Sequence, residues 1–398
     1  MKAILLVAHR WAGLTIALAV LVTGLTGAIL PWQDQLRSWF APQVWNAGPP
    51  TPGAEPLSGI ELVRRVERET GGIVSYIPLA PDPSHAQSIF LSSPPGAPPL
   101  DFEQVFVDPY SGEIRARVRF GDLRDGAINL MPFLVNFHYS LASGNWGRFL
   151  LGLAAFIWCL EAVAGLLLTV PRALRAGWRR RLRQWGRAWR IRGKPGSGTF
   201  TFDLHRASGL WLWPMTLVFG WSAVAFNLDV VHEPVQRFFG GEGLYQPVPN
   251  PTPDAGGPMS MEDAAATGAR LMAREAAEKG FTVHAPGALS LNPYNKVIGY
   301  YARTSLDGPT ENASTAVWFD QASGRQLAFR QPFGDTRADA VDKAMRMLHT
   351  ADLFGWPYKV LVTLFGLLTS IMALAGVILW LKRSNRRWRK AGFSTPDS

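Results

Sequence analysis

Long apolar runs alternate with polar segments along this chain. Four runs, at residues 11–32, 149–170, 207–228 and 360–381, are each about 22 residues long and carry one charged side chain among them, Glu161. A hydrocarbon core of about 30 Å takes roughly 20 apolar residues of helix. The pattern therefore predicts four membrane-spanning helices.

The polar segments between the first and second runs, and between the third and fourth, predict two small α+β lobes. Each contains the turn motif Asp-x-x-Ser-Gly, starting at Asp108 and at Asp320. We expect each lobe to hold together by a small core of its own. Helical spacing occurs at 59–70 and 260–279, and strand patterns occur at 73–77, 88–91 and 105–120, then at 282–289, 297–304 and 315–330.

Charge predicts how the chain crosses the membrane. The loop 171–204 carries ten Lys/Arg and one acid, and the tail from Lys382 carries six and one. The segments 33–137 and 229–356 each sum to −4. Since short basic loops stay in the cytoplasm, both termini and the basic loop should be cytoplasmic. The lobes should then be periplasmic, which favours a bacterial inner-membrane protein.

Composition narrows the possible classes. The net charge of +10 follows from this topology, so an anionic lipid leaflet is a better partner for the basic loop than a nucleic acid. The single cysteine, Cys159, lies in the second run, so the lobes contain no disulfide. There is no Cys-x-x-Cys-His motif, so any haem would be bound without covalent attachment, as haem b.

The chain is also an internal duplication. The motif His-Arg-x-x-Gly-Leu begins at His9 and recurs at His205, an offset of 196 residues, while His138 recurs as His349 at an offset of 211. Two domain-sized repeats of the same topology bring like ends together. The repeat therefore predicts that His9 pairs with His205 and His138 with His349, one pair near each membrane face. Bis-imidazole ligation of haem iron would suit electron transfer.

These motifs, in this order, resemble the PepSY-associated transmembrane family, which includes iron-regulated membrane proteins and ferric-siderophore reductases. The resemblance runs from His9 to Arg383. It implies a mainly α membrane protein: a four-helix transmembrane bundle built from a duplicated half, with two extracytoplasmic PepSY-like lobes. It also implies two b haems, with His9, His205, His138 and His349 as iron ligands.

The resulting domain order alternates spanning helices with lobes. We expect a first spanning helix (1–33), a first lobe (34–137), an interfacial turn with the second span (138–171), a basic loop (172–204), a third span (205–228), a second lobe (229–348), an interfacial turn with the fourth span (349–381) and a basic tail (382–398). Short interfacial helices around 129–141 and 335–348 should carry His138 and His349, which we call the outer histidines.

Several other residues have two interpretations. Arg10 and Arg206 could pair with haem propionates, or simply anchor the helices at the cytoplasmic face. Glu161 could take part in proton movement or form a structural hydrogen bond. His232 is a substitute ligand should an outer histidine fail, whereas His85 and His284 are expected to be ordinary lobe residues.

The sequence contains no GxGxxG after a strand and no phosphate-binding loop. Electrons should therefore come from a separate cytoplasmic reductase or flavoprotein, or from a quinol. We expect a haem-dependent membrane oxidoreductase that passes them to a periplasmic acceptor, foremost a ferric siderophore or other ferric chelate. The alternatives are a non-catalytic PepSY protein that binds a periplasmic partner such as a peptidase, and a transporter, which would need more mid-membrane charge than Glu161.

Overall fold

The computed structural model describes residues 2–171, 178–243, 257–292, 296–308 and 313–390. Within them, four helices are long and apolar enough to cross a membrane, as the hydropathy pattern predicts. Part of the basic loop, most of the proline-rich stretch 247–258 and the end of the basic tail lie outside these residues. The four long helices are α1 (Lys2–Ile29), α6 (Gly144–Thr169), α8 (Gly198–Asn227) and α12 (Gly355–Lys390).

These helices contact one another in a closed cycle. The helix α1 packs against α12 and α6, and α8 packs against the same two helices, so α1 and α8 face each other diagonally. Close approach depends on small residues: a Cβ added at Gly24 would lie 2.5 Å from Ser370 Oγ, and one at Gly220 would lie 2.8 Å from Cys159 Sγ. Glycine at both positions therefore lets neighbouring helices touch.

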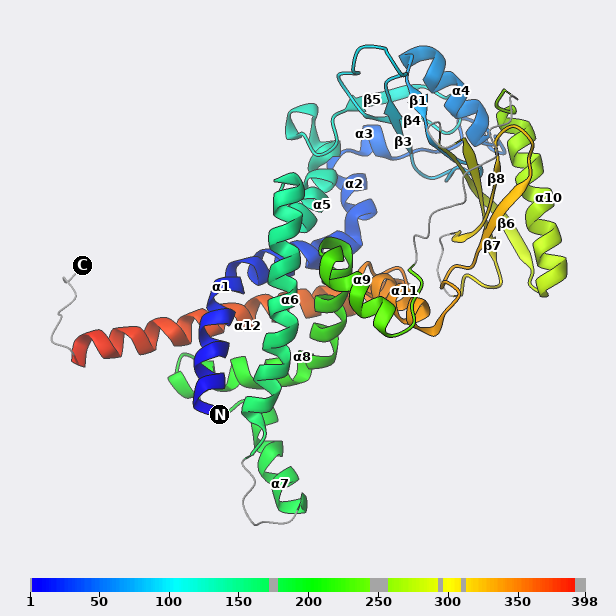
Figure 1. Ribbon diagram of the computed structural model, residues 1–398. Helices are drawn as coiled ribbons and strands as arrows, with labels where there is room; N and C mark the ends of the chain where they lie inside the picture. The colour runs from blue at the N-terminus through cyan, green and yellow to red at the C-terminus, as the bar shows by residue number, and fades with distance from the viewer. Residues whose placement is uncertain (1, 172–177, 244–256, 293–295, 309–312, 391–398) are drawn as a thin grey trace.

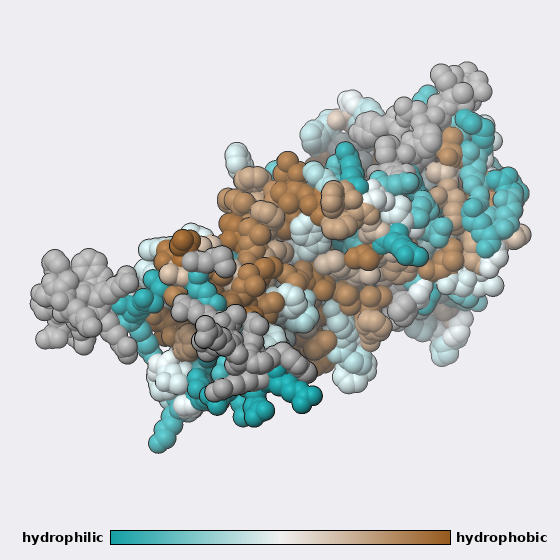
Figure 2. Space-filling model, turned by 60° about the horizontal axis from the view of Figure 1, so that its bottom comes forward, coloured by the Kyte–Doolittle hydropathy of each residue, from teal (hydrophilic) through white to brown (hydrophobic). Residues whose placement is uncertain are grey.

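Most of the apolar surface of the four helices faces outward. Only 22% to 44% of the most apolar window of each span is buried, and large side chains such as Leu18 (71% exposed) and Leu160 (55%) point away from the protein. Figure 2 shows hydrophobic side chains covering the middle of the molecule between hydrophilic surfaces. An apolar belt of this extent fits a lipid bilayer, because soluble proteins rarely expose large apolar patches.

Shorter helices surround this core. The predicted interfacial helices are present as α5 (Leu130–Ser140) and α11 (Arg337–His349). The remaining helices are α2 (Gln33–Phe40), α3 (Pro42–Trp45), α4 (Gly59–Thr70), α7 (Trp178–Trp185), α9 (Asp229–Phe238) and α10 (Met261–Lys279), with 3-10 turns at Leu30–Trp32, Leu123–Asp125, Ala127–Asn129 and Gly186–Trp189. In Figure 1, α4 and α10 lie beside the sheets and α7 lies at the opposite end.

Local chemistry sets the ends of the lobe helices. The Ser58 hydroxyl accepts a hydrogen bond from Glu61 N at the start of α4, and Ser260 caps α10 in the same way through Asp263 N. Such caps satisfy backbone N–H groups that have no partner inside the helix. After α4 the chain turns at Gly71, whose φ of +70° lies in the left-handed region that favours glycine.

The described residues form two antiparallel sheets, and the predicted strand positions are largely correct. One sheet has the order β1-β3-β4-β5, and the other has the order β2-β6-β7-β8-β9. The strands are β1 (Ile73–Val74), β2 (Tyr76–Pro78), β3 (Gln87–Ser92), β4 (Gln104–Val107), β5 (Ile114–Val118), β6 (Val283–Asn292), β7 (Val297–Thr304), β8 (Thr315–Asp320) and β9 (Gln326–Arg330).

The two Asp-x-x-Ser-Gly motifs form matching turns. Asp108 Oδ1 accepts hydrogen bonds from the backbone N–H groups of Tyr110 and Ser111 between β4 and β5. Asp320 Oδ1 accepts from the two corresponding N–H groups between β8 and β9. The predicted turns are therefore confirmed in both segments, and the strands on either side of each turn pair as a hairpin.

The expectation of a separate core in each lobe is only partly met: the first segment has a small cluster of its own around Trp45 and Phe106, but the larger core is shared between the two segments. The strand β2, from the first segment, pairs with β6 of the second, with Ile77 opposite Leu289. Both side chains are fully buried in one hydrophobic cluster that also contains Val66 of α4 and Met272 of α10. The two segments thus share one core. We call this joined unit the head.

Candidate functional site

The structure brings together the four histidines that the repeat pairs in sequence. The ring centres of His9 (α1) and His205 (α8) lie 6.3 Å apart, and so do those of His138 (α5) and His349 (α11). We call the first two the loop-side pair and the last two, whose helices adjoin the head, the lobe-side pair. The predicted pairing is thus observed, and the two rings of the loop-side pair come from the diagonally opposed helices α1 and α8.

Hydroxyl groups fix the tautomers of the lobe-side pair. Thr26 Oγ1 lies 2.8 Å from His138 Nδ1, and Ser222 Oγ lies 2.7 Å from His349 Nδ1. Each hydroxyl already donates its single proton to the carbonyl four residues earlier in its helix. It must therefore accept from the ring, which places the proton on Nδ1 and leaves Nε2 with a free lone pair.

The loop-side pair uses different acceptors. His205 Nδ1 lies 2.9 Å from the backbone carbonyl of Met372, an oxygen that can only accept, so this ring also has its proton on Nδ1. His9 Nδ1 lies 2.6 Å from Glu161 Oε2, although the two groups are not aligned as in a well-formed hydrogen bond. All four rings thus have an oxygen at Nδ1, the arrangement that usually orients a metal-ligating histidine.

The lobe-side rings are neutral at physiological pH. Although each ring keeps some accessible surface, burial lowers the pKa of His138 to about 4 and that of His349 to about 3. In the second ring the nearby His138 lowers the pKa further. A neutral imidazole is the form that binds a metal through its lone pair.

The separation within each pair tests whether one metal ion fits between the rings. An imidazole nitrogen lies about 2.0–2.1 Å from a bound metal and the ring centre about 1.2 Å further back, so two opposed ligands have centres about 6.4 Å apart. The observed 6.3 Å in both pairs agrees with this value. Each pair supplies two nitrogens, and the described residues contain no group of three or more His, Cys, Asp or Glu side chains that could hold a metal ion by themselves.

Small residues allow neighbouring helices to approach the imidazole edges. A Cβ added at Gly27 would lie 3.0 Å from His138 Cε1, and one at Gly376 would lie 3.1 Å from His205 Cε1. At Gly165 the corresponding distance to the His9 ring is 3.5 Å, an ordinary van der Waals contact. The first two positions therefore have little room for any larger side chain.

The arginines that follow the loop-side histidines have partners within the chain. Arg206 Nη2 lies 2.6 Å from Asp203 Oδ1, and its Nε donates to the Ala188 carbonyl at 3.1 Å, so it ties α8 to the end of the basic loop. Arg10 is likewise engaged in a contact. Their pairing with haem propionates stays a prediction.

The other histidines have separate roles. His232 is buried and its Nε2 lies 2.9 Å from Asp342 Oδ1 on α11, while Arg346 Nε lies 3.0 Å from the other carboxylate oxygen. This contact holds α9 against the helix that carries His349. His85 pairs with an aspartate of its own loop, and His284 lies on β6 in the head.

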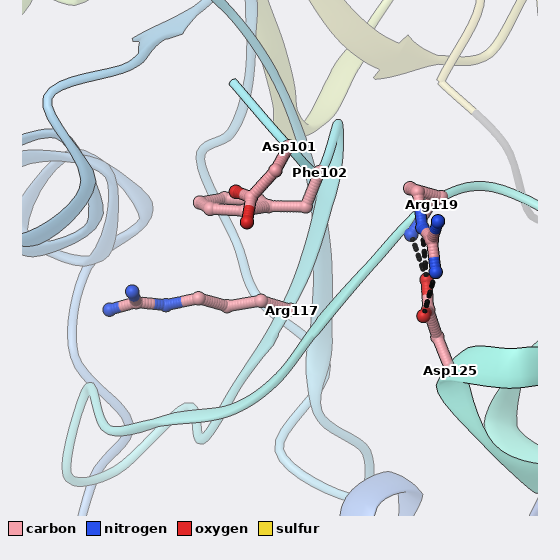
Figure 3. Close-up of a pocket in the computed structure, with 5 residues that line it drawn as sticks. All are labelled: Asp101, Phe102, Arg117, Arg119 and Asp125. Atoms are coloured by element: carbon pink, nitrogen blue, oxygen red, sulfur yellow. Dashed lines mark hydrogen bonds and ion pairs between the residues drawn. The ribbon is translucent and has the colours of Figure 1, made fainter.

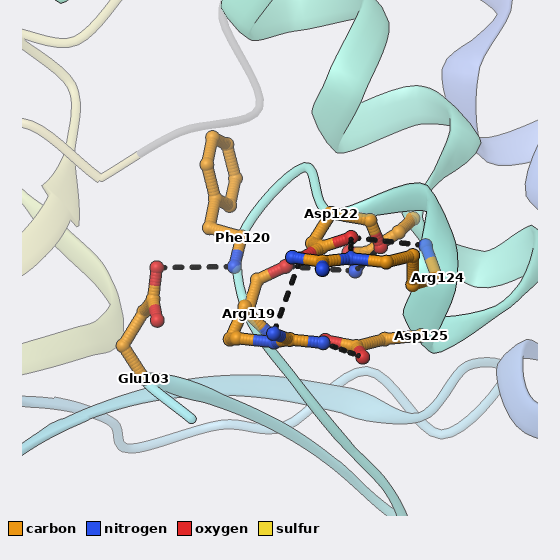
Figure 4. Close-up of polar contacts among 7 residues, drawn as sticks. Glu103, Arg119, Phe120, Asp122, Arg124 and Asp125 are labelled. Carbon is orange, nitrogen blue, oxygen red and sulfur yellow. Dashed lines mark hydrogen bonds and ion pairs between the residues drawn. The ribbon is translucent and has the colours of Figure 1, made fainter. Parts of the chain in front are cut away.

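A cluster of charges sets the start of the helix that carries His138. Arg119 Nη2 lies 2.6 Å from Asp125 Oδ1, and Arg124 Nη2 lies 2.6 Å from Asp122 Oδ2 (Figure 4). The fully buried Asn129 donates to the carbonyls of residues 119 and 122, at 2.8 Å each. The chain from β5 to α5 is therefore anchored on the head.

A pocket of about 380 Å³ lies beside this cluster (Figure 3). It is lined by Asp101, Phe102, Arg117, Arg119 and Asp125. Arg119 pairs with Asp125 inside the pocket, and Arg117 reaches Glu69 outside it. Two acids and two bases cancel, so the pocket offers no net charge to an anionic ligand.

Sequence reasoning did not assign the groups that hold the imidazoles. Thr26 and Ser222 are related by the same offset of 196 residues as the His-Arg motifs, and a hydroxyl repeated inside a span was an available signal. Glu161 was noticed as the one charged residue in a span, but its partner could not be read from the sequence because it lies on another helix.

These features define a class: a membrane protein of four spanning helices, with paired histidines at two levels and a β-rich head on one side. The chain belongs to the family of the PepSY-associated TM region, which it matches over residues 6–383. No curated protein matches it.

Proposed function

We propose that this protein binds two b-type haems, one between the rings of each histidine pair, and conducts electrons across the membrane. The observation that carries the proposal is the common arrangement of the four imidazole rings. Each has its Nδ1 engaged by an oxygen, and the ring centres within each pair are 6.3 Å apart. A haem held by these residues would supply reversible one-electron chemistry.

The spacing of the pairs suits a crossing of the bilayer. On α8, Ser222, which holds His349, lies 17 positions after His205, and on α1, Thr26, which holds His138, lies 17 positions after His9. At about 1.5 Å per residue the two levels lie about 25 Å apart. This is most of a hydrocarbon core of about 30 Å.

We infer that the two halves are copies of one unit. The hydroxyls at the lobe-side rings, Thr26 and Ser222, are equivalent at the first offset. Glu161 and Met372, which hold the loop-side rings, are equivalent at the second offset of 211 residues. Corresponding positions thus perform corresponding tasks, which is what a duplicated bundle with a pseudo-twofold axis requires.

The proposed outward direction of electron flow rests on the membrane orientation that the charge pattern predicts. With the basic loop in the cytoplasm and the head in the periplasm of a bacterial inner membrane, electrons enter at the loop-side pair from a reductase, flavoprotein or quinol. They leave at the lobe-side pair toward a periplasmic acceptor. We propose a ferric siderophore or another ferric chelate as that acceptor, so the protein acts as a ferric-chelate reductase.

An absorption spectrum of the purified protein, oxidised and dithionite-reduced, tests the proposal together with a pyridine haemochrome count. Low-spin b-type bands with two haems per chain are expected. His9→Ala and His205→Ala should each remove one haem, His138→Ala and His349→Ala should each remove the other, and His85→Ala should retain both. A folded, haem-free wild-type protein would refute the proposal and favour a PepSY protein that binds a periplasmic partner.

A further inference from the structure

One contact breaks the correspondence between the halves. Three of the four imidazoles have neutral acceptors at Nδ1, namely two hydroxyls and one backbone carbonyl. His9 instead faces the carboxylate of Glu161 at 2.6 Å. The residue at the equivalent position of the other half is Met372, whose side chain carries no charge. The carboxylate lies at the loop-side pair, whereas the lobe-side pair has hydroxyl groups at its Nδ1 atoms. The two histidine pairs therefore differ chemically.

The surroundings of Glu161 hold its carboxylate beside the His9 ring. The residue lies in α6, is 8% exposed, and is the one acid in the apolar runs. A Cβ at Gly13 would lie 3.3 Å from Oε2, so the glycine leaves space for the carboxylate beside α1. A charge in the spanning region is costly and is normally paired. His9 Nδ1 is the partner that the structure provides.

We infer that Glu161 is a positioning residue that, through His9, gives the loop-side haem the lower reduction potential of the two. The inference rests on the proposed function and deepens it. A carboxylate at Nδ1 makes an imidazole more basic and a stronger electron donor to its metal. A stronger donor stabilises ferric iron more than ferrous iron, and this lowers the potential. The neutral acceptors of His138 and His349 lack this effect.

The consequence is a downhill step toward the head. Haems held at the two pairs would supply reversible one-electron chemistry: the loop-side pair would give up one electron, the lobe-side pair would accept it, and the reduced cytoplasmic donor would replace it. No covalent bond would form or break. The two halves of the helix assembly otherwise correspond. The carboxylate at His9 alone thus makes electron flow toward the head the favourable direction.

Spectroelectrochemical titration of the full-length protein measures the two midpoint potentials. Glu161→Gln keeps a hydrogen-bond acceptor without the charge, and Glu161→Met installs the side chain found at the equivalent position. Met372→Leu is the matched control, because it changes the side chain but keeps the carbonyl that holds His205. The same substitutions in a His138→Ala background, which should retain the loop-side haem alone, assign the couples.

In both Glu161 variants the lower couple should rise by at least a tenfold change in the reduction equilibrium, which is 59 mV for one electron. The upper couple and both couples of Met372→Leu should not move. Unmoved couples in a Glu161→Gln protein that holds two haems would overturn the inference alone. So would loss of the loop-side haem from Glu161→Gln, because that would show a role in retention. A haem-free wild type would instead refute the proposed function.

Discussion

The hydroxyl of Thr26 offers a direct test of how the lobe-side pair is prepared. Thr26→Val replaces Oγ1 by a methyl group of similar shape, so packing on α1 is preserved while the acceptor at His138 Nδ1 is removed. The ring is then left with a buried N–H that has no partner, or it moves its proton to Nε2 and loses the lone pair that binds metal. Both outcomes weaken ligation.

The magnitude follows from the cost of an unpaired buried donor, about 1–3 kcal/mol. Since each 1.4 kcal/mol is a factor of ten in a binding constant, haem affinity at the lobe-side pair should fall by about 5-fold to 140-fold. This range matches the usual effect of removing a group that orients a metal ligand. The loop-side pair lies about 25 Å away along α1 and should be unaffected.

Titration of haem into the haem-free protein, followed by its main absorption band, measures both affinities in one experiment. Thr23→Val is the matched control: this threonine lies on the same helix, and its hydroxyl donates to the Ala19 carbonyl at 2.8 Å. It should bind two haems as the wild type does. A Thr26→Val protein with two sites of wild-type affinity would refute the tautomer argument.

Three further outcomes are expected. Gly376→Ala places a methyl group 3.1 Å from the His205 ring and should shift the loop-side haem spectrum, whereas the equivalent Gly165→Ala, with 3.5 Å available, should not; equal spectra would count against the packing argument. Ile77→Ala should destabilise the head by about 2–5 kcal/mol and melt both sheets in one transition, and two separate transitions would contradict the shared core. Burial raises the pKa of Asp342. The histidine and arginine bound to the carboxylate lower this pKa by more than burial raises it, so the net pKa lies below 3.8. Its contribution to stability is therefore complete above that pH and is lost below it, so melting temperatures at pH 5 and 3 should differ less in Asp342→Asn than in the wild type; an unchanged difference would refute this.

Much of the architecture could be predicted because it depends on local pattern. The four spans follow from runs of apolar residues, and the interfacial helices α5 and α11 lie within two residues of the expected 129–141 and 335–348. The histidine pairing was available because a repeat with one topology brings equivalent ends together. Each of these inferences uses either neighbouring residues or one fixed offset.

The features that could not be predicted from the sequence depend on contacts between distant segments. The crossing of β2 into the second sheet could not be predicted, because Ile73–Ile77 reads as one strand and the break between β1 and β2 reflects its two partners. The contact of Glu161 with His9 was hidden for a related reason: it joins α6 to α1, and the equivalent position, Met372, uses its backbone. A side-chain pattern cannot reveal a backbone acceptor.

The strand that passes between the sheets also bears on how the chain is made. The strand β2 of the first segment pairs with the edge of β6 in the second sheet. Among the described residues, no strand of the second segment joins the first sheet. Without β2, the edge of β6 would present unpaired N–H and C=O groups, a template for aggregation. A ribosome finishes β2 about 200 residues before it reaches β6, and domains fold from the N-terminus during synthesis. The strand β2 is thus already made when β6 emerges, and it is available to pair with the β6 edge at once. If the two halves were encoded in the reverse order, β6 would emerge first and its edge would stay unpaired until β2 was made.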